Sequence, residues 1–197
     1  MQSSFLAWML RMPLIKRWSL MFCVKPENIA EHSHQVAIVA HLLAVIKNKK
    51  FGGQVNADKI STIALYHEAS ETRYGDIVSP TKYANKAIAR EFKKIELLAE
   101  QECLASLPDE FQAIFSDIIV QDNVSEENKA IVKAADIIVA YIKALDEINH
   151  KNPEFDHVEQ RLAIKITQLK RSHPEVEYFI ETFMPACLAT VDKLSQN

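Results

Sequence analysis

The segment "YHEASETRYGD" places one histidine and two carboxylates close together in a stretch that otherwise has a helical, partly apolar pattern. At about 100° per residue, His67 and Glu71 fall on the same face as Ile63. Glu68 lies at the edge of that face. A buried carboxylate is costly, so it normally neutralises, pairs with a cationic group or binds a metal cation. For any one of these residues alone, a hydrogen-bonded or salt-bridged core group is the simpler interpretation.

His32 and Asp136 repeat this pattern on two further apolar segments. His32 projects on the same side as Val36, and Asp136 is the only charge in "AADIIVAYI". Taken singly, His32 is more often a satisfied core histidine. Asp136 is equally compatible with an exposed acid paired with a lysine, because its own stripe includes Lys129, Lys133 and Lys143. Taken together with His67 and Glu68, they form a mixed nitrogen and oxygen ligand set on three central helices, which suits a divalent metal ion.

The elements that must position these residues are all helical, because periodicity, caps and breakers predict six or seven helices and no strand. The main predicted helices cover residues 29–48, 57–74, 85–108, 108–121 and 125–149, and two more follow, the last one opening at Pro174 and kinked at Pro185. The first of them is apolar nearly all round, which predicts a central position in the bundle.

Composition excludes several classes of protein. At 197 residues with 48% hydrophobic content, 3 glycines and 7 prolines, the chain predicts a single all-α domain over residues 1–197. The net charge of -3 argues against binding a nucleic-acid polymer. Three cysteines without a CxxC pair indicate neither a disulfide framework nor a thiolate zinc site, and favour the cytoplasm. The longest apolar run, "AIVAHLLAVI", is about half a membrane span, so we expect a protein that does not cross the membrane.

The motifs "AEHSHQVAIVAH", "YHEASE", "GD" and "KAADIIVAYI" occur in the order His, His-acid, Asp. In this order the chain resembles the HD-domain phosphohydrolases, and more narrowly the bacterial 5'-deoxynucleotidases of that superfamily. The resemblance extends over nearly the whole chain and includes "LIKRWSLM" and "GDIVSPTKY". It implies a helical bundle with one divalent metal ion between central helices, held by His32, His67, Glu68 and Asp136.

The resemblance also implies roles around the metal. Glu71 would be the acid beside the reacting phosphate, and Arg17 would orient the phosphate. The implied substrate contacts are Arg17, Trp18, His32, Glu68, Asp76, Ile77, Val78, Ser79 and Asp136. One position departs from the superfamily pattern, since Glu68 stands where an aspartate is usual. Its carboxylate has the same charge and ligand atoms on a longer stem, which implies coordination with adjusted geometry or metal preference. Co, Mn, Zn, Fe, Cu and Mg are not distinguished by the sequence.

The implied activity is the hydrolysis of deoxyribonucleoside 5'-monophosphates to deoxynucleoside and phosphate, by a cytoplasmic enzyme that forms a homodimer. Two alternatives stay open at this point. The first is another HD-domain phosphohydrolase, such as a phosphodiesterase acting on a small phosphate ester. The second, kept open by the departure at Glu68, is an inactive metal-binding helical protein that serves as an interaction module.

Overall fold

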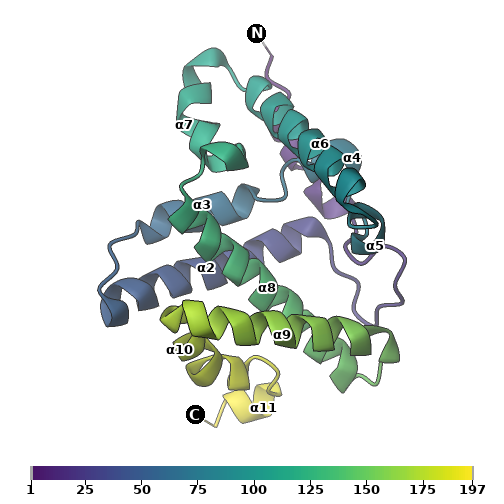
Figure 1. The fold of residues 1–197 in the computed structure, drawn as a ribbon, viewed down its shortest axis with the longest axis vertical. Helices are drawn as coiled ribbons and strands as arrows, with labels where there is room; N and C mark the ends of the chain where they lie inside the picture. The colour runs from purple at the N-terminus through teal and green to yellow at the C-terminus, as the bar shows by residue number, and fades with distance from the viewer. Residues whose placement is uncertain (1, 197) are drawn as a thin grey trace.

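The computed structural model describes residues 2–196, and within that range every regular element is a helix (Figure 1). The N-terminal half contains α1 (Phe5–Met9), the short 3-10 helix η1 (Met12–Leu14), α2 (Ile29–Phe51), α3 (Ala57–Tyr66), α4 (Glu71–Tyr74) and α5 (Ser79–Lys82). The rest contains α6 (Lys86–Ala105), α7 (Asp109–Ile119), η2 (Gln121–Asn123), α8 (Glu126–Asn149), η3 (Pro153–Phe155), α9 (Asp156–Ser172), α10 (Pro174–Thr182), η4 (Met184–Ala186) and α11 (Val191–Leu194). The all-α prediction is confirmed. The expectation of a single domain over residues 1–197 stays a prediction.

The centre of the molecule is formed by α2, which packs against α3, α8 and α10, as its apolar pattern predicts. Its first turn is closed by a capping box, in which the Asn28 side chain accepts from the Glu31 backbone and the Glu31 side chain accepts from the Asn28 backbone. The helix ends three residues later than predicted, where Gly52 adopts a left-handed conformation with φ of 71°. By length and composition α2 is also apolar enough to cross a membrane, but half of that window is buried inside the protein. We therefore interpret α2 as a core helix.

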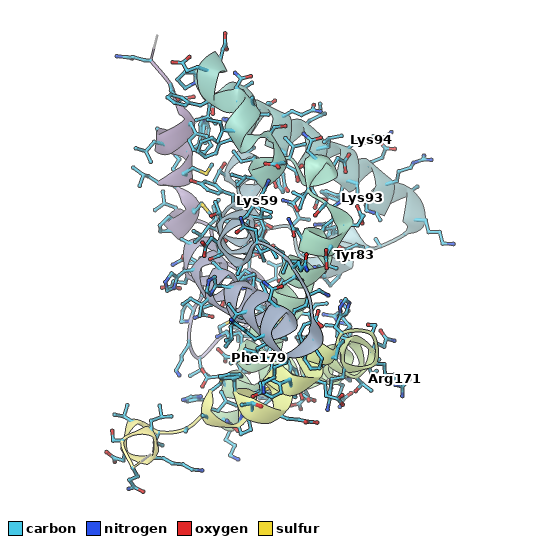
Figure 2. All side chains as sticks on the ribbon, turned by 90° about the vertical axis from the view of Figure 1, so that its left-hand side faces the viewer. Lys59, Tyr83, Lys93, Lys94, Arg171 and Phe179 are labelled. Atoms are coloured by element: carbon cyan, nitrogen blue, oxygen red, sulfur yellow. The ribbon has the colours of Figure 1, made fainter. Side chains whose placement is uncertain are left out.

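Three apolar clusters hold the remaining helices around α2. The largest joins α2, α3, α8, α9 and α10, and Figure 2 shows Phe179 of α10 where this helix meets α2. A second cluster around Phe155 packs η3 and α9 against the C-terminal half of α8, and Trp18 lies against it. The third joins Phe5, Cys103 and Ile119, so α1, α6 and α7 cover the other end of the bundle, at the top of Figure 1.

The predicted continuous helix over residues 57–74 is wrong at its centre. The α-helix stops at Tyr66, and residues 67–70 form a tight turn before α4. The His67 imidazole donates from Nδ1 to the Ala64 carbonyl at 2.7 Å, and that carbonyl is the one that would accept from the Glu68 backbone in a continued helix. The chain then continues through i to i+3 bonds, from Ala69 N to Tyr66 O and from Glu71 N to Glu68 O.

The loop between η1 and α2 is held by a buried carboxylate of α8. Glu147, 1% exposed, accepts from the backbone of Val24 at 2.8 Å and of Lys25 at 3.0 Å. It also accepts from Asn152 and pairs with Lys143. Burial by itself raises the pKa of Glu147, but these hydrogen bonds to the ionised form outweigh burial and lower it to about 2. The loop that carries residues 15–28 is thus attached to the core through one ionised side chain.

Glu147→Gln should therefore destabilise the protein by about 2–4 kcal/mol near neutral pH, because Lys143 loses its buried partner. A depressed folded-state pKa stabilises the protein above the unfolded value and ceases to do so as the pH falls toward about 2. The stability difference between wild type and variant should therefore shrink in acid. Urea denaturation at several pH values measures this.

The matched control is Glu154→Gln, at an exposed position of the same corner. It should change the free energy of unfolding by less than about 0.5 kcal/mol. Equal stability of the two variants at neutral pH would contradict the anchoring role of Glu147.

Candidate metal centre

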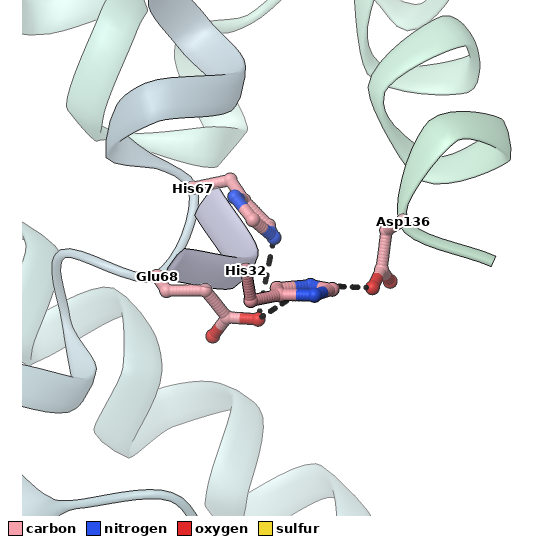
Figure 3. A group of neighbouring side chains, drawn as sticks. All are labelled: His32, His67, Glu68 and Asp136. Carbon is pink, nitrogen blue, oxygen red and sulfur yellow. Dashed lines mark hydrogen bonds and ion pairs between the residues drawn. The ribbon is translucent and has the colours of Figure 1, made fainter. Parts of the chain in front are cut away.

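Four side chains with nitrogen or oxygen ligand atoms converge on one point in the middle of the bundle (Figure 3). His32 comes from the first turn of α2, His67 and Glu68 from the turn after α3, and Asp136 from the middle of α8. One ligand atom of each lies within 4.8 Å of the others. The structure thus brings together all four residues that the sequence analysis singled out as metal ligands.

The closest contacts in this cluster join imidazole nitrogens to carboxylate oxygens. His32 Nε2 lies 3.1 Å from Asp136 Oδ1, and His67 Nε2 lies 3.3 Å from Glu68 Oε1. The other oxygen of Asp136 accepts from Lys133 at 2.6 Å. Asp136 thus pairs with a lysine of its own helix and also faces the histidines, but its side chain is only 17% exposed, so it is not the exposed acid that the sequence left open.

His67 has the protonation pattern of a metal ligand. Its Nδ1 faces the Ala64 carbonyl, which can only accept, so Nδ1 carries the proton and Nε2 presents a lone pair. Nε2 is buried and has no hydrogen-bond partner. A buried lone pair beside one further imidazole and two carboxylates matches the donor set of a divalent cation. The cluster therefore fits one divalent metal ion.

Electrostatics at the cluster favour positive charge. Burial by itself raises the pKa of Asp136, but Lys133 and His32 outweigh it and hold that pKa well below its usual range. Burial by itself lowers the pKa of His67, but the Glu68 carboxylate outweighs it and raises that pKa. The carboxylates are thus ionised and attract positive charge to the position that a cation would take.

Glu71 lies beside the cluster at the start of α4. It lines a cavity of about 200 Å³ together with His67, Glu68 and Asp136. Its Oε2 is buried without a hydrogen-bond partner. Burial and the neighbouring Glu68 carboxylate raise the pKa of Glu71, so this group holds a proton while Glu68 is ionised.

Arg17 and Trp18 approach the cluster from the loop before α2. Arg17 Nη1 lies 3.8 Å from Glu68 Oε1 and is buried without a hydrogen-bond partner. Trp18 has a φ of 58°, in the left-handed region that a bulky residue rarely adopts. Its ring packs edge-on against Phe155, with 5.3 Å between ring centroids. The pair that the sequence analysis assigned to phosphate and sugar is therefore adjacent to the cluster.

The predicted nucleoside-contacting loop runs from α4 into α5. Asp76 is half-buried, and burial raises its pKa although the charge of Arg17 acts in the opposite direction. Ile77 and Val78 are also half-buried, while Ser79 is exposed and begins α5. The charge of Arg17 therefore acts on Asp76. Substrate contacts by Ile77, Val78 and Ser79 stay predictions.

Two buried acids near the site were missed by the sequence analysis. Glu27 precedes α2 and accepts from the Trp18 indole at 2.8 Å. It lies in a loop, where helical periodicity gives no signal, and its only hint is its place just before the N-cap of the helix that carries His32. Glu100 of α6 lines the far end of the cavity and accepts from the Gln121 backbone, and burial raises its pKa to about 7. In the sequence, the only indication that Glu100 is buried was its position next to the apolar residues of that helix.

Sequence comparison agrees with this geometry. The model of the YfbR-like 5'-deoxynucleotidase family matches residues 4–187. A 5'-deoxynucleotidase of Vibrio vulnificus is 48% identical over 194 residues, which cover 98% of this chain and 99% of the relative. The 5'-deoxynucleotidase YfbR of Salmonella paratyphi B is 48% identical over 196 residues, 100% of this chain and 98% of the relative.

Solved structures share the fold at lower identity. An HD-domain phosphohydrolase from Listeria innocua has a TM-score of 0.80 at 23% identity and covers 98% of this chain and 92% of its own. An HD phosphohydrolase of cyanophage S-2L, bound to dA and one catalytic Zn²⁺, has a TM-score of 0.64 at 19% identity and covers 89% of this chain and 93% of its own. The resemblance seen in the sequence is confirmed, and the chain belongs to the YfbR-like 5'-deoxynucleotidase family, with the fold of the HD-domain phosphohydrolases.

Proposed function

We propose that this protein is a metal-dependent 5'-deoxynucleotidase, which hydrolyses deoxyribonucleoside 5'-monophosphates to the deoxynucleoside and inorganic phosphate. The observation that carries the proposal is the convergence of the four ligand residues beside an arginine whose buried Nη1 has no partner. The full-length relatives named 5'-deoxynucleotidases support the reaction. The cyanophage structure with dA and Zn²⁺ supports the pairing of a deoxynucleoside with a divalent ion on this fold.

We propose His32, His67, Glu68 and Asp136 as the ligands of one divalent cation. When bound, such a cation supplies Lewis-acid activation of water and neutralises charge on the phosphate. Glu68 is suited to this role although an aspartate is usual at its position, because its carboxylate reaches the other three ligand atoms despite the longer stem. The same residues stabilise the cation by their charge, since two carboxylates stay ionised in a buried site.

Arg17 would bind the phosphate, and Glu71 would donate a proton to the leaving group. Arg17 presents a permanently charged, planar guanidinium, and its buried Nη1 is available to a phosphate oxygen. Glu71 holds a proton in the same cavity, so it can donate that proton to the departing 5'-oxygen. Asp76 borders the same arginine and would limit where the nucleoside lies.

Trp18 would provide the preference for deoxyribose. Its ring is fixed on one side by Phe155 and through its N–H by Glu27. An apolar ring against the C2' position offers no hydrogen-bond partner, so a 2'-hydroxyl there would lose water without compensation. If the substrate contacts are concentrated on phosphate and sugar, the enzyme would discriminate little between different bases.

His67→Ala should lower phosphate release from deoxynucleoside 5'-monophosphates by at least ~100-fold, because the cation loses a ligand. The assay is phosphate release from a panel of deoxy- and ribonucleotides, run with different divalent ions. His34→Ala, at an exposed position on α2, is the control and should retain activity.

The same panel separates the alternatives. Cleavage of phosphodiesters in preference to monoesters would favour another HD-domain phosphohydrolase. Metal binding without release from any ester would favour an inactive interaction module. Undiminished hydrolysis by His67→Ala would contradict the proposed ligand set.

Trp18→Ala should reduce the preference for deoxy- over ribonucleotides by about tenfold in kcat/KM, because the apolar wall at C2' is removed. The measurement compares paired substrates that differ only in the 2'-hydroxyl. Trp8→Ala removes the other indole of the chain, which lies on α1 under the Arg73 guanidinium, and should leave the preference unchanged. Identical discrimination by wild type and Trp18→Ala would eliminate the proposed role.

A homodimer and a cytoplasmic location remain predictions of the family resemblance. Exposed leucines of the N-terminal segment support self-association, since Leu6, Leu10 and Leu14 are 64%, 69% and 77% exposed. Light scattering of the purified protein would give twice the chain mass if the dimer forms.

A further inference from the structure

Glu27 is a buried carboxylate, 8% exposed, that lies between the first proposed metal ligand and the pair proposed to hold phosphate and sugar. Its two oxygens face in different directions. Oε2 faces Arg17 and Trp18, and Oε1 faces His32. The proposed function gives this side chain no role, although burying a carboxylate is costly unless it is paired and hydrogen-bonded.

On the first side, Glu27 holds Arg17 and Trp18. Both lie in the loop of residues 15–28 before α2, which we call the substrate loop because these two residues are proposed to contact the substrate. Its Oε2 accepts from the Trp18 indole at 2.8 Å and lies 3.4 Å from Arg17 Nε. Its backbone carbonyl accepts from the Arg17 backbone at 2.9 Å. Trp18 at the same time occupies the left-handed region, with a φ of 58°. A bulky residue stays in that region only when surrounding contacts impose it, and the bond to Glu27 is such a contact.

On the second side, Glu27 faces the free nitrogen of His32. This imidazole is fully buried, and its Nε2 lies 3.1 Å from Asp136 within the ligand cluster. Its Nδ1 is buried and has no hydrogen-bond partner. Glu27 Oε1 is a carboxylate oxygen facing that Nδ1 at 3.9 Å, which is longer than a hydrogen bond in this structure. A histidine ligand typically donates its second N–H to a carboxylate or carbonyl, which fixes the tautomer.

We propose that Glu27 is a positioning residue that serves the metal site and the substrate loop together. In the metal-free protein His32 Nε2 faces the Asp136 carboxylate, which can only accept, so Nε2 carries a proton there. One Glu27 oxygen would accept from His32 Nδ1 once a cation replaces that proton on Nε2. The other oxygen fixes the Trp18 ring and the Arg17 side chain beside the same cation. The proposal rests on the proposed function, because it takes His32 as a ligand and the loop as the substrate contact.

Glu27→Gln tests the metal side. The amide oxygen can still accept from Trp18, but the amide nitrogen is a donor and would face His32 Nδ1, which favours the tautomer with the proton on Nε2. We expect the affinity of the metal-free protein for Co²⁺ or Zn²⁺ to fall by about 10–100-fold, measured by calorimetric titration without nucleotide. Glu31→Gln is the matched control, because it makes the same change at an exposed position of the same segment and glutamine preserves the capping box.

Nitrogen-15 and proton spectra of the Zn²⁺-loaded protein read the His32 Nδ1–H directly. In the loaded wild type this proton should give a downfield resonance that exchanges slowly with solvent, and in Glu27→Gln that resonance should move upfield or be lost. A loaded wild type in which the His32 Nδ1–H shows no hydrogen-bonded shift would overturn the proposal, and this result does not depend on whether any variant folds. Unchanged metal affinity in a folded Glu27→Gln protein would overturn it as well.

Glu27→Ala tests the loop side in a Trp8→Phe background, where Trp18 is the only tryptophan. We expect the Trp18 emission to shift to longer wavelength and KM for the deoxynucleotide to rise, because the indole loses its buried acceptor. An unchanged Trp18 emission spectrum would contradict the proposal that Glu27 serves both the metal site and the substrate loop. If Glu27 governs metal affinity and Trp18 emission while no deoxynucleotide is hydrolysed, the proposed function fails and the positioning role is supported.

Discussion

The structure depends on one constraint, which is that ionisable side chains are placed inside an all-helical bundle whose other central positions are apolar. His32 is fully buried, and Asp136, Glu68 and His67 are mostly shielded from solvent. Such groups are tolerated only when charges balance, and here the carboxylates are paired with imidazoles, Arg17 and Lys133. A divalent cation would complete that balance, which explains why a ligand set in this position is compatible with a stable core.

The side chains of the cluster are positioned by two kinds of local structure, regular helix and tight turn. The proposed ligands His32 of α2 and Asp136 of α8 lie within long, regular helices, so their directions follow from helical geometry. His67 and Glu68 instead lie in a turn that interrupts a helix, and the imidazole of His67 itself takes the backbone acceptor that would have continued it. The same hydrogen bond ends the helix and leaves Nε2 as the lone-pair nitrogen. Local backbone structure and ligand chemistry are therefore coupled in one residue.

The loop before α2 shows how a segment with little regular structure is positioned. Glu147 of α8 accepts two of its backbone N–H groups, and Glu27 accepts the indole of Trp18 from within it. Both acids are buried and both are bonded to groups of the loop, so acidic side chains hold its conformation together with the apolar packing of Trp18, Met21 and Cys23. Trp18 can thus adopt its left-handed backbone and still lie against Phe155.

Periodicity and caps were sufficient to predict the helical class, the central place of α2 and the extent of α8, because each of these is set by neighbours within a few turns. The order of His32, His67, Glu68 and Asp136, together with the inward faces of the two histidines, predicted a metal-binding set, and the structure brings these four side chains together. The turn at residues 67–70 depends on a side-chain bond that no hydrophobic pattern records. The partners of Glu27 are near it in the sequence but lie in an irregular loop that periodicity does not describe, whereas Glu147 binds residues up to 123 positions away. Only the tertiary structure decides such contacts, since the burial and partners of an acid are set by helices distant in the chain.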